Sequence, residues 1–363
     1  MAKIGPLFPI LQPSPNQPTE PLTGLARTAA EAPLDSTGCL TEYRPLTSRS
    51  IINKVTSNRG LPFTHAINPY RGCEFACRYC YARYTHEFME MTPGDFERRI
   101  YFKQNAAWLL EQELKRLKPG TQISIGTATD PYQPLERRLK VTQSLLEVFA
   151  RHRGFRLGII SKSALIARDV ELLKEVARNN TLTVHITVTT MSTNLARKLE
   201  PRAPRPDLRM RTLAALREAG LRAGVMCSPL MPGITDSAAS IRAVARAASN
   251  AGASFLASGA LFLKPCSLPT FLGFVREHFP EQLADYERRY ASSAFVSSAY
   301  RERMAALVNQ ICREFNLGKR YMYEDAAKEE APQVVELQPW LPFSGAPRQP
   351  RGHSAGSPVA LSS

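Results

Sequence analysis

The stretch RLGIISKSALIARDVELLKEVARNNTLTVHITVT, residues 156–189, decides the fold of this chain. It opens with a short apolar run of strand type at 156–161 and closes with another at 182–189. A segment with helical period separates them at 166–178. A strand, a helix and a second strand in this order predict a βαβ unit with two parallel strands. Near-continuous apolar runs such as LGII fit a sheet that is covered on both faces.

The same alternation continues in both directions along the 363-residue chain, which is long enough to bury a large core. Short apolar runs predict strands at 65–70, 122–127, 156–161, 182–189, 221–229 and 253–261. Segments with helical period lie near 104–117, 138–151, 166–178, 207–219, 236–250 and 270–278. Such repeats predict a parallel sheet, in a βα barrel or a doubly wound layer. Asp236 is expected to begin one helix, and Gly220 to follow another at the C′ position.

Composition divides the chain into four parts. Residues 1–45 and 328–363 are rich in Pro, Thr and Ser without a sustained period, and we expect them to be disordered tails. The βα repeats occupy residues 46–279, and residues 280–327 predict a C-terminal helical extension.

Charge and cysteine content limit the function classes. Residues 1–50 and 328–363 each carry equal numbers of basic and acidic side chains, so the net charge of +15 belongs to residues 51–327. This charge favours an anionic partner such as nucleic acid. A basic surface without such a partner would have the same composition. Seven cysteines do not form a disulfide framework, and no apolar run approaches the roughly 20 residues that span a bilayer. With no secretory signal at its N-terminus, the chain is expected to be a cytoplasmic protein with reduced thiols and no membrane partner.

Three of the seven cysteines lie within eight residues, in the stretch RGCEFACRYCYAR. Cys73, Cys77 and Cys80 have C-x3-C-x2-C spacing and follow the first predicted strand, so they are expected at the carboxyl edge of the sheet, where such folds place their active sites. A structural zinc ion needs four ligands, and His86 would give a fourth at an unusual spacing. Three thiolates on a four-iron cluster would leave one iron free. Three unrelated core cysteines are the remaining explanation.

With Tyr79 as the aromatic residue before Cys80, this motif resembles that of the radical S-adenosylmethionine (SAM) superfamily. The resemblance implies a partial (β/α)6 TIM-type barrel and one [4Fe-4S] cluster held by the three cysteines. It further implies that SAM is cleaved to a 5′-deoxyadenosyl radical, which abstracts hydrogen from a substrate. An electron donor such as a flavodoxin or a ferredoxin would be a partner.

Downstream segments are similar to those of the spore photoproduct lyase-like branch, which includes DNA repair photolyase-like proteins. The resemblance runs from about residue 50 to about 265 and rests on segments at predicted strand ends: GTATDPYQPLE (126–136), SKSALIARDVELL (161–173), TVTT (187–190), LEPRAP (199–204) and PLMPGITD (229–236). It implies that a nucleic acid is a candidate substrate.

The second predicted strand ends in three oxygen-bearing side chains. The hydroxyls of Thr127 and Thr129 and the carboxylate of Asp130 could accept hydrogen bonds from the amino group of SAM. The resemblance implies that Thr129 makes the contact with SAM that a serine makes in the family. Asp-Pro and Gln-Pro are also strong turn formers, so these residues could simply shape the loop.

Two other strand ends offer candidate contacts with the cofactor. The resemblance implies that Lys162 binds the carboxylate of SAM, and pairing with Asp130 or Glu136 is the structural alternative. Thr187 and Thr189 share one face of their strand and could contact the ribose, or they could be packed core residues.

The sequence differs from the photoproduct lyases at one residue that takes part in their reaction. Those enzymes carry a hydrogen-donating cysteine where this chain has Thr127, which puts reversal of the spore photoproduct in doubt. Cys227, at the end of the fifth predicted strand, could replace it as a donor or could be a buried packing residue. Cys39, Cys266 and Cys312 are too scattered to hold a second cluster.

A run of basic residues follows the fourth predicted strand and could form a track for phosphates or a solvated helix face. Its members are Arg197, Lys198, Arg202, Arg205, Arg209, Arg211, Arg217 and Arg222. The sequence therefore predicts a radical SAM enzyme. A non-catalytic iron–sulfur protein for electron transfer or redox sensing, and a zinc-stabilised nucleic-acid-binding module, are the alternatives.

Overall fold

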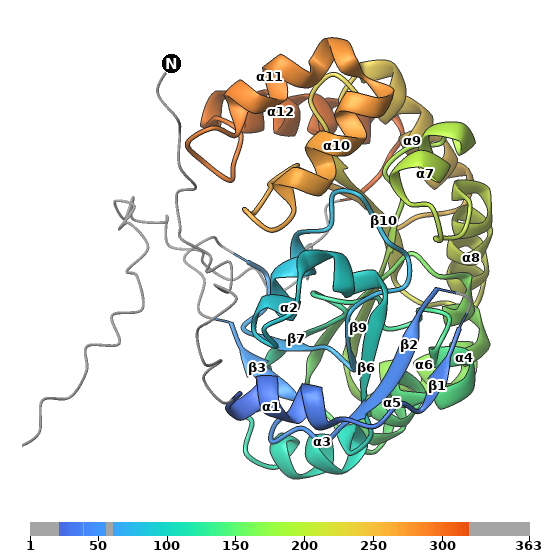
Figure 1. Cartoon of the computed structure of the whole chain (residues 1–363). Coiled ribbons are helices and arrows are strands. Elements are labelled where there is room, and N and C mark those ends of the chain that lie inside the picture. The colour runs from blue at the N-terminus through green and yellow to red at the C-terminus, as the bar shows by residue number, and fades with distance from the viewer. Residues whose placement is uncertain (1–21, 39, 56–60, 319–363) are drawn as a thin grey trace, which may run out of the picture. The chain divides into compact units, whose positions relative to one another are not determined.

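The computed structural model describes residues 22–38, 40–55 and 61–318. Two sheets and the helices around them make up this part of the chain (Figure 1). The predicted tail at 328–363, residues 1–21 of the other predicted tail, and Cys39 lie outside the described residues. No helix of the described part is long and apolar enough to cross a bilayer.

The main sheet has the strand order β11-β10-β9-β8-β7-β4-β3. Its strands are β3 (Ile52–Lys54), β4 (His65–Ile67), β7 (Gln122–Ile125), β8 (Arg156–Ser161), β9 (Thr181–Thr187), β10 (Ala223–Leu230) and β11 (Leu256–Ala260). All are parallel except β3, which pairs antiparallel with β4 at one edge. Because successive parallel strands are neighbours, right-handed crossovers put every connecting helix on the same face. The prediction of a partial (β/α)6 barrel is confirmed, and the sheet is open between β3 and β11.

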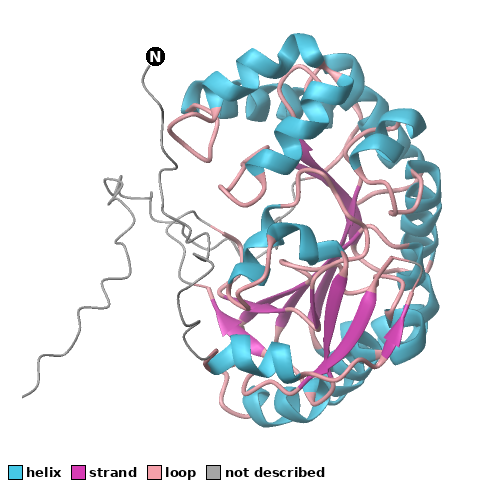
Figure 2. Cartoon of the chain, in the orientation of Figure 1, coloured by secondary structure: helices cyan, strands magenta, loops and turns pink. Residues whose placement is uncertain are grey.

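The six predicted helices are present and lie outside the main sheet (Figure 2). They are α3 (Ala106–Leu114), α5 (Val141–Arg151), α6 (Val170–Asn179), α8 (Pro206–Glu218), α9 (Ala238–Asn250) and α10 (Leu268–His278). Gly220 follows α8 in the left-handed conformation, as predicted. The predicted start of α9 at Asp236 is wrong by one residue, because the Ser237 hydroxyl caps the helix and Asp236 instead accepts a hydrogen bond from Gly233.

The two faces of the main sheet differ in polarity. On β9, the side chains of Val184 and Ile186 belong to the hydrophobic core, and they alternate with those of His185 and Thr187. A Cβ atom added at Gly158 would lie 3.6 Å from the imidazole of His185 and 3.9 Å from the hydroxyl of Ser124, so polar side chains of neighbouring strands face one another. The apolar core therefore lies against the helices, and the inner face is polar.

A second sheet, with the order β1-β2-β6-β5, was not predicted. Its strands are β1 (Ser36–Thr37), β2 (Glu42–Leu46), β5 (Tyr70–Arg71) and β6 (Arg99–Lys103), and the short helices α1 (Gly24–Glu31), α2 (Tyr84–Glu87), α4 (Glu136–Leu139) and α7 (Thr193–Leu199) were missed as well. The prediction of a disordered tail over 1–45 is wrong for residues 22–38 and 40–45. Helix α1 buries Ala26 and Ala29, and β2 pairs along its whole length with β6. These segments are too short to show a period, and they are stabilised by the partner strand.

The predicted C-terminal extension contains α11 (Leu283–Arg289) and α12 (Ser298–Glu314). Helix α12 packs on β11 and α9, and its side chains Val308 and Ile311 join the same hydrophobic core as the barrel. The thiol of Cys312 lies 3.7 Å from the carbonyl oxygen of Leu256 in β11. Residues 280–318 are thus an integral part of the barrel unit.

Candidate active site

The three cysteines share one loop between β5 and the 3-10 helix η1 (Tyr81–Arg83). The chain enters this loop through Gly72, whose φ of +84° is left-handed. A Cβ atom at Gly72 would lie 2.7 Å from the carbonyl oxygen of Phe96, so the entry requires glycine. Ala76, in the middle of the loop, is also left-handed, with φ of +54°. The backbone N–H of Cys73 donates to the same Phe96 carbonyl at 3.0 Å.

The three thiols lie in surroundings that disfavour their free ionised forms. Burial raises the pKa of Cys73 well above its ordinary value, and the charges of Asp130, Cys77 and Cys80 raise it further. Burial also raises the pKa of Cys80, and it raises the pKa of Cys77 to about 12 although Lys162 lowers it. Thiolates in such a place need a cationic metal centre. The three side chains therefore fit as the ligands of a cluster.

The structure does not favour a zinc site. His86, the predicted fourth ligand, hydrogen-bonds through Nε2 to the carbonyl oxygen of Arg99 at 2.9 Å, and its ring packs against Phe96 and Tyr101. Burial lowers the pKa of His86 to about 4. Among the described residues, no three His, Cys, Asp or Glu side chains are grouped to hold a single metal ion. Three thiols without a fourth ligand would suit an iron–sulfur cluster that keeps one iron free.

Lys162 follows β8 and points toward the cysteine loop. Its ammonium lies 5.7 Å from the centroid of the Tyr79 ring. Burial alone would lower the pKa of Lys162, but the neighbouring Cys77 thiol and Glu200 carboxylate raise it above its ordinary value. No carboxylate of the described residues comes within 4 Å of this ammonium. Lys162 therefore has room for an anionic partner.

Glu200 and Arg209 form a buried ion pair beside Tyr79, at 2.5 Å and with both side chains about 1% exposed or less. The Tyr79 hydroxyl donates to Glu200, and Arg209 also donates to the carbonyl oxygens of Thr187 and Pro204 at 3.0 and 2.7 Å. Burial raises the pKa of Glu200, but Arg209 and Lys162 more than reverse this and hold it below its ordinary value. Neither residue was predicted for the site; the only sequence signal was the segment LEPRAP.

The candidate residues after β7 are occupied by contacts inside the protein. The Thr129 hydroxyl donates to the carbonyl oxygen of Gly72 at 2.6 Å, and Thr127 bonds the side chain of Asn68 at 3.2 Å. The carboxylate of Asp130 accepts hydrogen bonds from the N–H of Tyr132, the hydroxyl of Ser161 and the N–H of Lys162. Asp130 is thus bound to the backbone of Lys162 and not to its ammonium. These bonds tie three strand ends together, which supports the loop-shaping alternative for Asp130.

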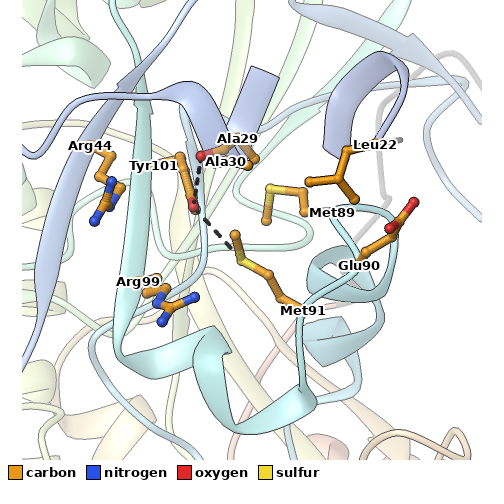
Figure 3. Close-up of a pocket in the computed structure, with 9 residues that line it drawn as sticks. All are labelled: Leu22, Ala29, Ala30, Arg44, Met89, Glu90, Met91, Arg99 and Tyr101. Atoms are coloured by element: carbon orange, nitrogen blue, oxygen red, sulfur yellow. Dashed lines mark hydrogen bonds between the residues drawn. The ribbon is translucent and has the colours of Figure 1, made fainter. Parts of the chain in front are cut away.

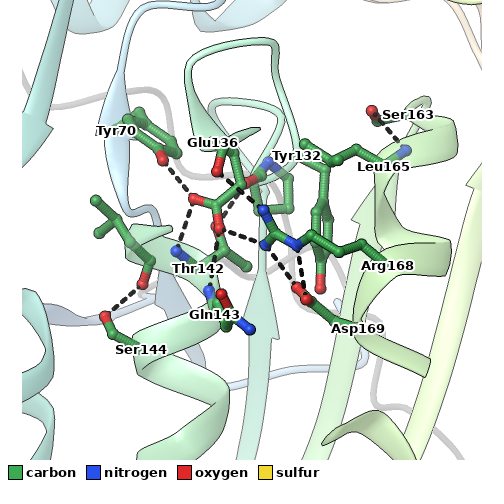
Figure 4. Close-up of polar contacts among 12 residues, drawn as sticks. Tyr70, Tyr132, Glu136, Thr142, Gln143, Ser144, Ser163, Leu165, Arg168 and Asp169 are labelled. Atoms are coloured by element: carbon green, nitrogen blue, oxygen red, sulfur yellow. Dashed lines mark hydrogen bonds and ion pairs between the residues drawn. The ribbon is translucent and has the colours of Figure 1, made fainter. Parts of the chain in front are cut away.

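Glu136, the other predicted partner of Lys162, pairs with Arg168 of the 3-10 helix η3 (Ala164–Asp169) at 3.0 Å. Its carboxylate also accepts hydrogen bonds from the Tyr70 hydroxyl and from the N–H groups of Thr142 and Gln143 (Figure 4). The alternative that Lys162 pairs with Glu136 is therefore wrong. Glu136 joins the strand that leads into the cysteine loop to the segment after β8.

Thr187 and Thr189 lie on the side of the barrel that carries Glu200. The Thr189 hydroxyl is 3.5 Å from the Glu200 carboxylate, and the carbonyl oxygen of Thr187 accepts the bond from Arg209. Both threonines are buried, and Val188 between them belongs to the apolar core. The structure brings them to the same end of the barrel as Tyr79 and Lys162, as predicted.

Cys227 faces away from the other candidate residues. It is buried in the apolar core, and its pKa is raised to about 12 by burial and then by Cys312 of α12. Because α12 packs against β11 and α9, this places the thiol on the helix-covered face of the sheet. The neighbours of Cys227 along β10, Met226 and Ser228, are half-buried and point to the opposite face. The placement supports the packing alternative.

We expect Cys227 to resist alkylation in the folded protein. A thiol with a pKa of about 12 is thiolate in only roughly one molecule in 10⁴ at pH 8, and burial excludes the reagent. Iodoacetamide followed by mass spectrometry should modify Cys227 only after unfolding in urea. Modification of the folded protein on the same time scale as the unfolded control would return this thiol to the list of candidate hydrogen donors.

For the basic run after β9, the sequence left open a track for phosphates or a solvated helix face, and most of its members bind groups of the protein. Arg209 is paired with Glu200, Arg217 donates to the carbonyl oxygens of Leu221 and Gly252, and Arg222 lies over the ring of Phe255. Arg205 pairs with Asp207, and Arg202 donates a hydrogen bond to the carbonyl oxygen of Glu97. These cations stabilise loops and helix ends.

A surface hollow of about 370 Å³ lies beside α1, and none of the three cysteines lines it (Figure 3). It is lined by Leu22, Ala29, Ala30, Arg44, Met89, Glu90, Met91, Arg99 and Tyr101. Arg44 pairs with Glu42 at 3.1 Å, and Arg99 lies within 4 Å of Glu42 and Asp95. The carboxylates of the protein thus neutralise both cations of the hollow. No predicted site residue lines the hollow.

Solved structures share this fold. A spore photoproduct lyase mutant superposes with a TM-score of 0.58 at 15% identity, covering 82% of this chain and 84% of that one. Spore photoproduct lyase complexed with a dinucleoside spore photoproduct gives a TM-score of 0.54 at 14% identity, covering 75% and 79% of the two chains. At such identities the likeness shows the fold alone.

Relatives by sequence include an uncharacterized protein of Mycobacterium bovis, which is 31% identical over 76% of this chain and 81% of its own length. An uncharacterized protein of Methanocaldococcus jannaschii is 30% identical over 47% of this chain and 62% of its own length. The model of the radical SAM superfamily matches residues 67–243, from the end of β4 into α9. With its three-cysteine loop at the mouth of a partial barrel, this chain belongs to the radical SAM superfamily.

Proposed function

We propose that this enzyme holds one [4Fe-4S] cluster on Cys73, Cys77 and Cys80 and cleaves SAM reductively to abstract hydrogen from a substrate. When bound, the cluster and SAM supply the electron and the radical for this chemistry. The observation that carries the proposal is the ammonium of Lys162, which faces the cysteine loop and has no carboxylate of the described residues within 4 Å. A protein that only transfers electrons would use a fourth thiolate and would have no need of this cation.

The chain's own residues suggest how SAM would be held. Lys162 would bind its carboxylate, since an ammonium is a point charge that a carboxylate can compensate. Thr187 and Thr189 lie at the same strand end and would face the ribose. Thr129 fixes the loop through its bond to Gly72 and would present its hydroxyl oxygen to the amino group. Tyr79 would lie between the cluster and Lys162.

An anionic substrate such as a nucleic acid fits the net charge of +15. Two observations disfavour reversal of a thymine photoproduct. The resemblance aligns Thr127 with the donor cysteine of photoproduct lyases, but Thr127 has no thiol and is bound to Asn68. Cys227 lies on the helix-covered face of the sheet. A flavodoxin or a ferredoxin would supply the electron. A cytoplasmic location would keep the thiols reduced, and Cys73, Cys77, Cys80, Cys227, Cys266 and Cys312 are all free.

Electron paramagnetic resonance on anaerobically reconstituted, dithionite-reduced protein tests the proposal. We expect a reduced four-iron signal that changes when SAM is added, and 5′-deoxyadenosine in the reaction mixture by chromatography. A cluster signal indifferent to SAM would favour the electron carrier. A colourless protein with bound zinc would favour the zinc-stabilised module.

Replacing Lys162 by alanine is expected to weaken SAM binding about 10- to 100-fold, which corresponds to the loss of one charge-assisted hydrogen bond. The spectrum of the cluster should be unchanged, because the three thiol ligands are intact. Equilibrium dialysis with labelled SAM measures the affinity, and Lys162→Arg, which keeps the charge, should retain part of it. Equal affinity in wild type and Lys162→Ala would remove this residue from the site.

A further inference from the structure

Two cations lie side by side on the second sheet, outside the proposed SAM site. Arg71 of β5 pairs with Tyr101 of β6 in the antiparallel register, and Lys103 lies two residues beyond Tyr101 on the same face. Lys103 is only 4% exposed, and the Nε atom of Arg71 is fully buried. Two like charges of this kind are costly so close together unless an anion lies between them.

No carboxylate among the described residues forms an ion pair with either cation. Arg71 Nε makes no hydrogen bond, and no carboxylate of the described part lies within 4 Å of either cation. Burial and the charge of Arg71 lower the pKa of Lys103 to about 7. Glu113 favours the charged form of Lys103, but its carboxylate already accepts the N–H groups of Ile51 and Ile52 at 3.0 and 2.8 Å. The ammonium therefore lacks a committed counter-ion.

Aromatic side chains and a third cation border this pair. Arg71 lowers the pKa of Tyr84, whose overall pKa is raised by burial, so the two side chains are close. The ammonium of Lys264, from the segment after β11, lies 3.4 Å from the centroid of the Tyr84 ring. The ring of Phe88 packs edge-on against Tyr84 at 5.6 Å and is 61% exposed. Glu87, an exposed residue near Lys264, is the acidic side chain at this border.

We propose that Arg71 and Lys103 form an oxyanion site that takes a phosphate group, with Lys264 and Tyr84 at its border. A guanidinium and an ammonium on neighbouring strands can together neutralise a doubly charged phosphate and donate to several of its oxygens. Exposed Phe88 beside the cations offers a ring on which a base could stack, as in proteins that bind single-stranded nucleic acid. The phosphate could belong to such a strand or be free in solution, and binding at this site does not require the radical chemistry.

Binding of two probes to the reconstituted holoenzyme, in a buffer without phosphate or sulfate, tests the site. Inorganic phosphate is titrated by calorimetry, and a fluorescently labelled single-stranded oligothymidine by anisotropy. In Lys103→Met we expect inorganic phosphate to bind about tenfold more weakly, since one charge-assisted contact is lost. The matched control is Arg211→Gln, which removes one exposed cation from α8 and should leave phosphate affinity within about twofold of wild type.

Thermal unfolding without phosphate separates a ligand site from a structural lysine. Since Lys103 lacks a committed counter-ion, Lys103→Met should melt at the same temperature as wild type or higher, whereas loss of a structural ion pair would lower it. Weakened binding of both probes assigns the phosphate of a nucleic acid, and weakened binding of inorganic phosphate alone assigns a free phosphate. Unchanged affinity for both probes in Lys103→Met and in Arg71→Gln would overturn the proposal. Cluster content and 5′-deoxyadenosine formation, measured in the same samples, report separately on the radical chemistry.

Discussion

Cys77→Ala is expected to yield a folded protein without an iron–sulfur cluster. The substitution removes one of the three proposed thiol ligands. Among the described residues the loop offers no replacement, since His86 is hydrogen-bonded to the carbonyl oxygen of Arg99. Iron and sulfide should fall to background after anaerobic reconstitution, and no 5′-deoxyadenosine should form. The thiol is buried but small, so the apoprotein should lose only about 1 kcal/mol of stability.

Cys227→Ala is the matched control for this experiment. It removes a thiol that is equally buried but lies on the helix-covered face, so iron and sulfide should match those of the wild type. Circular dichroism of both apoproteins confirms that the barrel is folded. Retention of a full complement of iron and sulfide by Cys77→Ala would refute the assignment of the cluster to this loop.

The barrel could be predicted from sequence because each of its strands carries its own signal. Strands such as β8 and β9 contain four or more nearly continuous apolar or β-branched residues, and each is followed by an amphipathic helix. The second sheet has no such signal. Strand β5 has only two residues. Strand β2, with the sequence EYRPL, contains a proline, and its apolar and polar residues alternate only weakly. Their conformation depends on pairing with β6, which sequence periodicity cannot show.

The candidate site could be predicted only in part. The cysteines and Lys162 stand out because thiols cluster rarely and a lysine just after a buried strand is unusual. Glu200 and Arg209 were missed as a pair because they are nine residues apart, and only the turn after α7 brings them together. Asp130 was expected to contact the cofactor, but it binds the backbone at the ends of β7 and β8. Which acceptor a carboxylate finds depends on tertiary packing.

The Glu200–Arg209 pair connects the separate parts of the site. Through Tyr79 the pair holds the cysteine loop, and through Thr187 it is fixed to β9. The carboxylate of Glu200 favours the charged form of Lys162, and the guanidinium of Arg209 opposes it. The backbone around Glu200 also contacts the loop, since the N–H of Arg78 donates to the carbonyl oxygen of Leu199 at 2.9 Å. We therefore infer that this pair positions the loop and Lys162 relative to each other without touching the reacting atoms.

Glu200→Gln should destabilise the protein strongly. The variant keeps the size of the side chain and an acceptor for Tyr79 but leaves the buried guanidinium of Arg209 without its counter-charge. Breaking a buried pair in this way costs about 3–5 kcal/mol, and we expect the melting temperature to fall by roughly 10 °C. The remaining folded protein should bind SAM more weakly, because the broken pair no longer fixes Tyr79 and Lys162 relative to each other.

Two further variants separate the pair from its surroundings. Arg205→Gln breaks an ion pair with Asp207 that is exposed to solvent, and it should leave the melting temperature unchanged. Combining Glu200→Met with Arg209→Met removes both charges at nearly constant volume, so it should recover most of the stability lost in Glu200→Gln while SAM affinity stays low. If Glu200→Gln melts no lower than Arg205→Gln, the buried pair does not hold the loop. If the double variant recovers SAM affinity together with stability, the pair acts on the fold and not on the position of Lys162.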